Sequence, residues 1–352
     1  MICRVRRYGF INAKLRARIS KILTDERIGR LAEAPSLERA LALLRDTSFA
    51  PLEEVYRRTG DLKAGELELF RQEVEVHLDL ERYLEGEVLE LARALGLRYE
   101  IENLKNGIRL FFERSHGGVI DDILPYLYRG DIRNGVDAAR VAGARDLDEV
   151  AETLAPTPYL ELFERHRRSI EQDGSLFPLE SALDRHYYRQ LLAAAGRLDR
   201  LDRPVALRII GIEIDLTNLS WIIRLRTFHQ LSPDAVMPLI VPQGTTGGEE
   251  LVRSVYERDP LQALQMLIRK QHPELAALLS SRPSDPGSRL LLIEQILKQI
   301  LLHEVGRILS GFPFTVGILL SYMILKREEI RKVRAVLNAR SYGMPADRIR
   351  SL

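Results

Sequence analysis

The stretch YEIENLKNGIRLFFER at residues 99–114 has a close counterpart in IGIEIDLTNLSWIIRLR at residues 210–226. Both contain Asn-Leu followed by Ile-Arg, and six positions separate the asparagine from the arginine, in the pairs Asn103 with Arg109 and Asn218 with Arg224. Acidic residues precede each copy, at Glu100 and Glu102 in the first and at Glu213 and Asp215 in the second. The repetition predicts that the chain uses one building block more than once.

A third copy opens the chain. In YGFINAKLRAR, at residues 8–18, Asn12 and Arg18 have the same separation. A fainter echo is LKREEIR at residues 325–331, where Leu325 takes the place of the asparagine and Arg331 that of the arginine. Equivalent positions in similar modules point toward a common axis. We therefore predict Arg18, Arg109, Arg224 and Arg331 as partner-binding residues around a central cavity, with ordinary ion pairing as the alternative.

A second phrase follows each of the first three copies. SLERALALL begins at Ser36, DLDEVAETL at Asp146 and DPLQALQML at Asp259, and each pairs a capping residue with apolar residues at the same four offsets. Further on, Thr47 and Phe49 match Thr157 and Tyr159, whereas the third copy has Lys270 and His272. The order of phrases predicts three helical modules in a pseudo-threefold arrangement, at residues 1–98, 99–209 and 210–352. Coincidence between amphipathic helices is the alternative.

Composition agrees with a helical protein. The 352 residues are 45% hydrophobic, 29% charged and only 7% aromatic, and signals for strands are weak. The net charge of +2 excludes a polyanion binder that acts by overall charge. A single cysteine, Cys3, excludes an internal disulfide and fits a reducing cytoplasm.

Two segments carry specific structural predictions. The pattern at residues 65–97 predicts one long helix that stops at Gly96. Residues 308–325 contain no charged side chain, but Ser310, Gly311 and Pro313 indicate a turn near the start. We therefore expect a buried core helix in the third module, with a membrane span as the alternative.

Motifs of catalysis are not found in the sequence. No pair of the seven histidines has the spacing of a zinc protease, and His303-Glu304 lacks the second histidine of that motif. The Gly-rich stretches do not continue into a phosphate-binding loop, and no nucleophile elbow occurs. We therefore expect no catalytic site, no metal and no cofactor.

The two ends of the chain are basic. Residues 4–30 and the stretch from Lys326 onward are rich in lysine and arginine. Such ends are suited to RNA, to anionic lipid or to an acidic protein. Because no nucleic-acid motif and no aromatic stacking pattern accompanies them, a protein partner is favoured and nucleic acid is not expected.

Across nearly its full length the sequence resembles the C subunits of the archaeal and bacterial V/A-type rotary ATPases, whose counterpart in the eukaryotic vacuolar enzyme is the d subunit. The resemblance is carried by the phrases at residues 8–18, 99–109 and 210–226, together with FPFTVGILLSYMILKREEIRKVRAVLNARSYGMPADRI at residues 312–349. It implies an all-α, funnel-shaped protein of three similar modules with a central cavity and no catalytic site.

The resemblance also implies a place in a machine. Such a protein lies on the cytoplasmic face of the membrane, without a membrane span of its own, as part of the complex. It joins the central axle subunits to the proteolipid ring and passes torque between them as ions are transported. Two alternatives remain at this point: a helical scaffold that binds another protein or RNA through its basic ends, and an enzyme with an unrecognised site.

Overall fold

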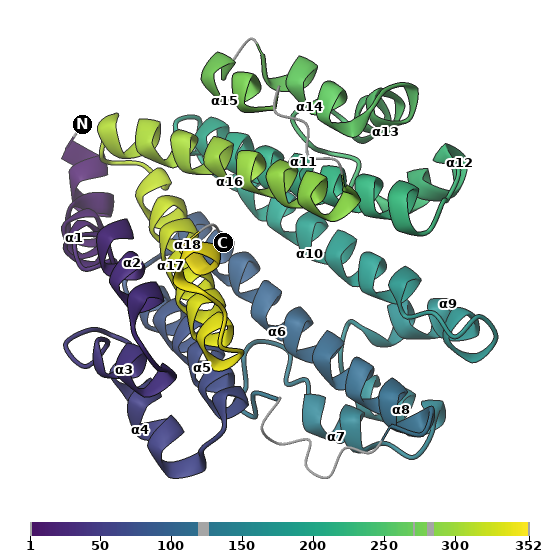
Figure 1. Ribbon diagram of the computed structural model, residues 1–352. Helices are drawn as coiled ribbons and strands as arrows, with labels where there is room; N and C mark the ends of the chain where they lie inside the picture. The colour runs from purple at the N-terminus through teal and green to yellow at the C-terminus, as the bar shows by residue number, and fades with distance from the viewer. Residues whose placement is uncertain (1, 119–126, 270–271, 280–284, 351–352) are drawn as a thin grey trace. The chain divides into compact units, whose positions relative to one another are not determined.

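The computed structural model describes residues 2–118, 127–269, 272–279 and 285–350 (Figure 1). Every regular element in these ranges is a helix, and they contain no β-strand. The prediction of an all-α protein is therefore confirmed. The chain divides into two compact units, which we name after their longest helices and describe separately.

The α11 unit comprises residues up to Tyr8 together with Phe177–Ser321. It contains the first turns of α1 (Ile2–Ile19) and of α17 (Gly317–Ser341). Its remaining helices are α10 (Phe177–Arg197), α11 (Asp202–Phe228), α12 (Pro233–Val236), the 3-10 helix η2 (Met237–Leu239), α13 (Gly248–Glu257), α14 (Pro260–Ile268), α15 (Pro273–Leu278) and α16 (Pro286–Ser310).

The α6 unit comprises Gly9–Leu176 and the chain from Tyr322 onward. It contains the remaining turns of α1 and α17. Its other helices are α2 (Asp25–Glu33), α3 (Leu37–Ala42), α4 (Pro51–Thr59), α5 (Leu62–Glu81), α6 (Gly86–Ser115), α7 (Ala138–Gly143), α8 (Leu147–Leu154), α9 (Leu160–Glu171) and α18 (Ala346–Arg350).

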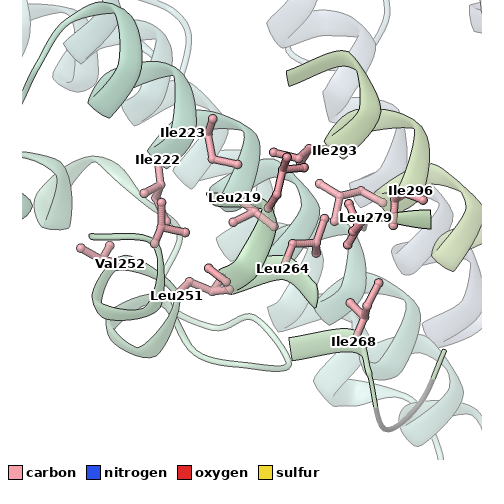
Figure 2. Close-up of a cluster of buried hydrophobic side chains, with 14 of the residues drawn as sticks. Leu219, Ile222, Ile223, Leu251, Val252, Leu264, Ile268, Leu279, Ile293 and Ile296 are labelled. Atoms are coloured by element: carbon pink, nitrogen blue, oxygen red, sulfur yellow. The ribbon is translucent and has the colours of Figure 1, made fainter. Parts of the chain in front are cut away.

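The core of the α11 unit lies between its two long helices and the short helices α13 to α15. Leu219 and Ile222 of α11, Leu251 of α13, Leu264 of α14 and Ile296 of α16 are each at most 2% exposed and form one cluster (Figure 2). Burial of an aliphatic side chain contributes about 1.5–3 kcal/mol to folding, so this cluster is the main source of stability of the short helices.

A buried carboxylate fastens the first turns of α1 to the start of α11. Asp202 has no exposed surface, and it accepts hydrogen bonds from Arg4 Nη1 at 3.1 Å, from Tyr8 Oη at 2.5 Å and from the backbone amide of Val316 at 2.9 Å. Burial and the bond to Asp202 raise the pKa of Tyr8. Residues from distant parts of the sequence therefore complete this part of the α11 unit.

The core of the α6 unit also joins distant parts of the sequence. Leu31, Leu41 and Leu52 of the N-terminal helices form one buried cluster with Ile330 and Val333 of α17. Next to it, Lys326 Nζ binds Glu329 Oε2 at 2.7 Å and Ser48 Oγ at 3.0 Å. Glu329 Oε1 accepts the backbone amide of Leu23 at 2.7 Å, so α17 is tied to the residues before α2.

The predicted capping residues begin their helices. Ser36, Asp146 and Asp259 accept backbone amides at the starts of α3, α8 and α14. The matching threonines also share one geometry. Thr47 Oγ1 donates to the carbonyl of Leu44 and accepts the amide of Phe49, and Thr157 does the same with Leu154 and Tyr159. Phe49 and Tyr159 are both fully buried, whereas Lys270 lies outside the described residues.

The prediction of one long helix that stops at Gly96 is wrong. The chain breaks after α5 and restarts as α6 at Gly86, whose φ of 55° lies in the left-handed region that glycine adopts easily. Gly96 is in the interior of α6, where a Cβ atom would come within 2.6 Å of His77 Nε2. Glycine is therefore needed at this position because α5 and α6 pack closely there. In the sequence alone, a glycine required by such packing looks the same as a glycine that ends a helix.

The apolar segment at residues 308–325 contains the predicted turn. α16 ends at Ser310, α17 begins at Gly317, and residues such as Ile318, Leu319 and Leu320 are at most 3% exposed. The prediction of a buried core helix is confirmed. Among the described helices, none combines the length with the apolar character that a membrane crossing requires.

Candidate partner-binding site

A hollow of about 380 Å³ lies in the α6 unit between α5, α6 and the second half of α17. Apolar, amide and charged side chains line it. The described residues that line it are Lys63, Glu66, Leu67, Phe70, Asn103, Asn106, Arg109, Leu110, Glu113 and Arg334. The described lining includes no histidine, hydroxyl or thiol.

Buried contacts fix the walls of the hollow. Asn103 is 4% exposed; its Nδ2 donates to the carbonyl of Tyr128 at 2.8 Å and its Oδ1 accepts the amide of Tyr128 at 2.9 Å. Phe70 packs edge-on against the rings of Tyr99 and Tyr128, with centroids 6.1 and 6.0 Å away. On the third side, Asn338 Nδ2 donates to Glu66 Oε1 at 2.7 Å. The hollow is therefore preformed.

The electrostatics of this region are dominated by arginine. Arg334 lines the hollow, and its buried Nε–H finds no acceptor among the residues that the structure describes. Burial raises the pKa of the nearby Glu73 carboxyl, although the positive charges of Arg334, Arg327 and Arg98 oppose this shift. An unpaired buried guanidinium N–H costs free energy, so a partner that brought an acceptor to this atom would be bound favourably.

The asparagine of the copy at residues 210–226 makes the same contact as Asn103. Asn218 is fully buried; its Nδ2 donates to the carbonyl of Val241 at 2.7 Å and its Oδ1 accepts the amide of Val241 at 2.8 Å. The bonded residue is 25 positions downstream of Asn103 and 23 positions downstream of Asn218. The copies at residues 99–114 and 210–226 thus form the same ring of two hydrogen bonds, one copy in each unit.

Carboxylates three positions before these two asparagines form a second shared contact. Glu100 accepts the backbone amides of Arg133 and Asn134 at 3.0 and 2.6 Å, before α7. Asp215 accepts the amide of Thr246 at 2.8 Å, before α13. Glu329 of α17 accepts the amide of Leu23, before α2, in the same manner. α17 therefore holds the residues before α2 as α6 holds those before α7.

Comparison with known proteins agrees with these repeated contacts. The family model described as ATP synthase (C/AC39) subunit matches residues 11–352. The chain belongs to the ATP synthase (C/AC39) subunit family. It is 25% identical to the C subunit of the A-type ATP synthase of Pyrococcus abyssi, in a match that covers 98% of this chain and 90% of the relative. The corresponding C subunit of Methanosarcina acetivorans is 24% identical over 95% of this chain and 89% of its own length.

Four arginines were predicted as partner-binding residues. Of these, Arg109 lines the hollow. Its Nη1 is 3.4 Å from Asn106 Oδ1. Arg18, Arg224 and Arg331 are not among the described lining residues, and each binds an acid of its own unit. The acids are Asp79 for Arg18, Glu294 at 2.6 Å for Arg224 and Glu328 at 3.1 Å for Arg331.

Two cationic residues of the hollow were not predicted, Lys63 and Arg334. Arg334 lies three positions after Arg331, on the same helix. When Glu329 is aligned with Glu100 and Asp215, the copy in α17 moves by seven positions, about two helical turns, and Asn338 takes the place of the arginine. The motif therefore gives no signal for Arg334.

Proposed function

We propose that this chain is a non-catalytic adaptor in the central rotor of a V/A-type rotary ATPase or ATP synthase. It joins the central axle subunits to the proteolipid ring, on the cytoplasmic face of the membrane, and couples ion transport to ATP hydrolysis or synthesis. The observation that carries this proposal is the family match from residue 11 to residue 352.

The internal contacts support the proposal because a part that transmits torque must be stiff. Each unit has a buried asparagine that holds a distant loop through two hydrogen bonds, in one case to Tyr128 and in the other to Val241. Buried carboxylates secure further loops. Buried polar contacts of this kind favour one conformation, and dense packing makes the body resist deformation.

The three-module organisation is part of the proposal. The shared contacts of Glu100, Asp215 and Glu329 support three related blocks, at approximately residues 1–98, 99–209 and 210–352, with α17 also serving the first block. Residues 98 and 99 both lie within α6, and residues 209 and 210 both lie within α11. Neighbouring blocks therefore share helices and have no linker between them. We propose a pseudo-threefold funnel around a central cavity.

For contact with the axle we propose the hollow of the α6 unit. Arg109, Lys63 and Arg334 offer three cationic groups beside the apolar side chains of Leu67 and Phe70. This combination suits the end of a helix, whose last carbonyl oxygens carry partial negative charge and whose side chains are partly apolar. Arg18, Arg224 and Arg331 remain weaker proposals for partner contacts, because none of them is among the described residues that line the hollow.

The alternative of RNA binding through basic ends has less support. Arg4 and Arg7 bind Asp199, and Arg18 binds Asp79. The Nζ atom of Lys14 lies 3.9 Å from the centre of the Tyr83 ring. These cations therefore already have partners within the protein, with which a phosphate group would have to compete. The enzyme alternative has less support, because the described lining of the hollow contains no histidine, hydroxyl or thiol.

A reconstitution experiment tests the adaptor role. The complex is prepared without this chain, and ATP hydrolysis and ATP-driven ion uptake are measured in vesicles. We expect hydrolysis without ion uptake, and recovery of uptake when the chain is added. Full coupling in its absence would refute the proposal.

A charge-reversal variant then tests the contact surface. Arg109→Glu is expected to weaken binding to the axle subunits about 10- to 100-fold, because it places a negative charge in the hollow. Arg165→Glu is the matched control. Arg165 is 61% exposed and binds Glu161 one turn earlier on α9, outside the described lining of the hollow. Equal affinities of the two variants would reject the hollow as the axle contact while leaving the adaptor role intact.

A further inference from the structure

Two histidines and a glutamate gather at the start of α15 and along α16, in the α11 unit. His272, Glu274 and His303 each offer one donor atom, and these atoms all lie within 4.8 Å of one another. His272 Nδ1 is 3.9 Å from Glu274 Oε1, and the two imidazole rings are 5.1 Å apart at 81°. The cluster is separate from the proposed partner contact, which belongs to the other unit.

His272 stands out in comparison with the other copies of the repeat. At the same distance from the capping residue, the first two copies have Phe49 and Tyr159, whose rings are fully buried. The third copy has a histidine that is 4% exposed. Its buried Nδ1 finds no hydrogen-bond partner in the part of the chain that the structure describes. A buried nitrogen without a partner costs free energy, so a bound group that used it would stabilise the fold.

Glu304 follows His303 on α16. Glu304 is not available as a ligand, because its two carboxylate oxygens accept hydrogen bonds from Arg208 at 2.7 and 2.9 Å and from Arg307 at 2.8 Å.

We propose that His272, Glu274 and His303 form a binding site for a divalent transition metal of the Zn²⁺ class. Two imidazole nitrogens and one carboxylate oxygen are donors that Zn²⁺ prefers, and the fourth position would hold water. Donors of a tetrahedral zinc site lie about 3.3–3.6 Å apart. The exposed side chains of Glu274 and His303 can rotate to close the remaining distance onto the buried His272.

Such a metal would join the start of α15 to α16. α15 has six residues, and its N-cap residue His272 makes no side-chain capping bond. A six-residue helix has little stability of its own. A metal that binds the residue before its first turn and a side chain of the long α16 would therefore hold it in place.

Zinc titration of the full chain, without an affinity tag, tests the proposal by calorimetry. We expect one saturable site per chain and a higher thermal midpoint with Zn²⁺ present. Visible absorption of bound Co²⁺ should report a four-coordinate site. The wild-type chain without saturable binding would overturn the proposal.

Three variants separate the metal site from other effects. His272→Phe introduces an aromatic ring like that of Phe49 and should keep the fold. Loss of a residue that only hydrogen-bonds to a metal ligand lowers metal affinity roughly 10- to 100-fold. Because His272 is itself a proposed ligand, we expect its replacement to lower zinc affinity by more than this. His303→Ala, at an exposed position, should give the same loss. His116→Ala removes an exposed histidine of the other unit and should leave zinc binding unchanged. Unaltered binding in both His272→Phe and His303→Ala would refute the site.

Discussion

Asn218 forms a two-bond ring with the backbone of Val241, donating to its carbonyl at 2.7 Å and accepting from its amide at 2.8 Å. The side-chain amide thereby pairs with the backbone in the way that a peptide group of a neighbouring β-strand would. The described residues of this protein contain no strand. It holds the loop between η2 and α13 against α11.

Asn218→Ala should therefore cost about 2–4 kcal/mol of unfolding free energy, because it leaves one buried amide and one buried carbonyl without a partner. Urea unfolding measures the change. Asn12→Ala is the control from the opening copy of the motif. Asn12 is half-buried, and its side-chain oxygen accepts a bond of 3.3 Å from Arg16, so a loss below about 1 kcal/mol is expected. Similar losses in the two variants would contradict this account of the ring.

Gly107→Ala should destabilise the α6 unit by about 1–3 kcal/mol. A Cβ atom at this position would lie 2.7 Å from the carbonyl oxygen of Ala138, and the backbone of α7 has to move to admit it. Gly196, near the end of α10, has no heavy atom within 4 Å of such a Cβ atom. Gly196→Ala should therefore stabilise the protein by up to about 1 kcal/mol. Thermal unfolding of both variants gives the comparison, and a shift of the same sign in both would disprove it.

Glu73→Gln should make the protein more stable at neutral pH. The pKa of Glu73 is raised by burial. Folding therefore favours the protonated carboxyl, whose stabilising effect is complete below the unfolded pKa and is lost as pH rises through the folded pKa. Glutamine does not ionise, so the variant avoids this loss, and its advantage should vanish in acid.

Glu68→Gln is the control with the opposite sign. Burial opposes ionisation of Glu68, but hydrogen bonds from Arg71 and Gln72 lower its pKa overall. Its contribution is present above the unfolded pKa and disappears as pH falls through the folded pKa. Glu68→Gln should therefore be less stable than the wild-type chain at neutral pH. Urea unfolding at several pH values checks both variants, and parallel pH profiles would argue against the assigned shifts.

Lys326→Ala should cost about 3–5 kcal/mol, because it leaves the buried carboxylate of Glu329 without its cation. Arg331→Ala, on the same helix, removes a 47% exposed partner of Glu328 and should cost less than about 1 kcal/mol. Chemical unfolding distinguishes the two. A large loss for Arg331→Ala would give this residue a structural role that its exposure does not explain.

The helix starts could be predicted because they depend on short-range chemistry. Ser36 and Asp146 cap helices through residues three positions later, and these predicted caps are confirmed. The bonds of Thr47 and Thr157, to residues two and three positions away, are equally local, but the sequence showed only that these positions match.

The copy in α17 shows what local sequence leaves open. A search for the asparagine leads to Leu325, but the contact that defines this copy belongs to Glu329, which binds the amide of Leu23. Three positions after Glu329 the chain has Lys332, which binds Asp25, so the asparagine ring has no counterpart here. The partners are far apart in sequence, and only the folded chain identifies them. Arg334 was missed for the same reason.

The contacts of Asp202 have a consequence for biosynthesis. It binds Arg4 and Tyr8, which leave the ribosome early, and the amide of Val316, which follows only after some three hundred further residues. The cluster that contains Leu31 and Leu41 likewise waits for Ile330 and Val333. Neither unit can close before α17 has been synthesised, so the nascent chain keeps apolar surface uncovered until then. Chaperone engagement during translation would protect that surface.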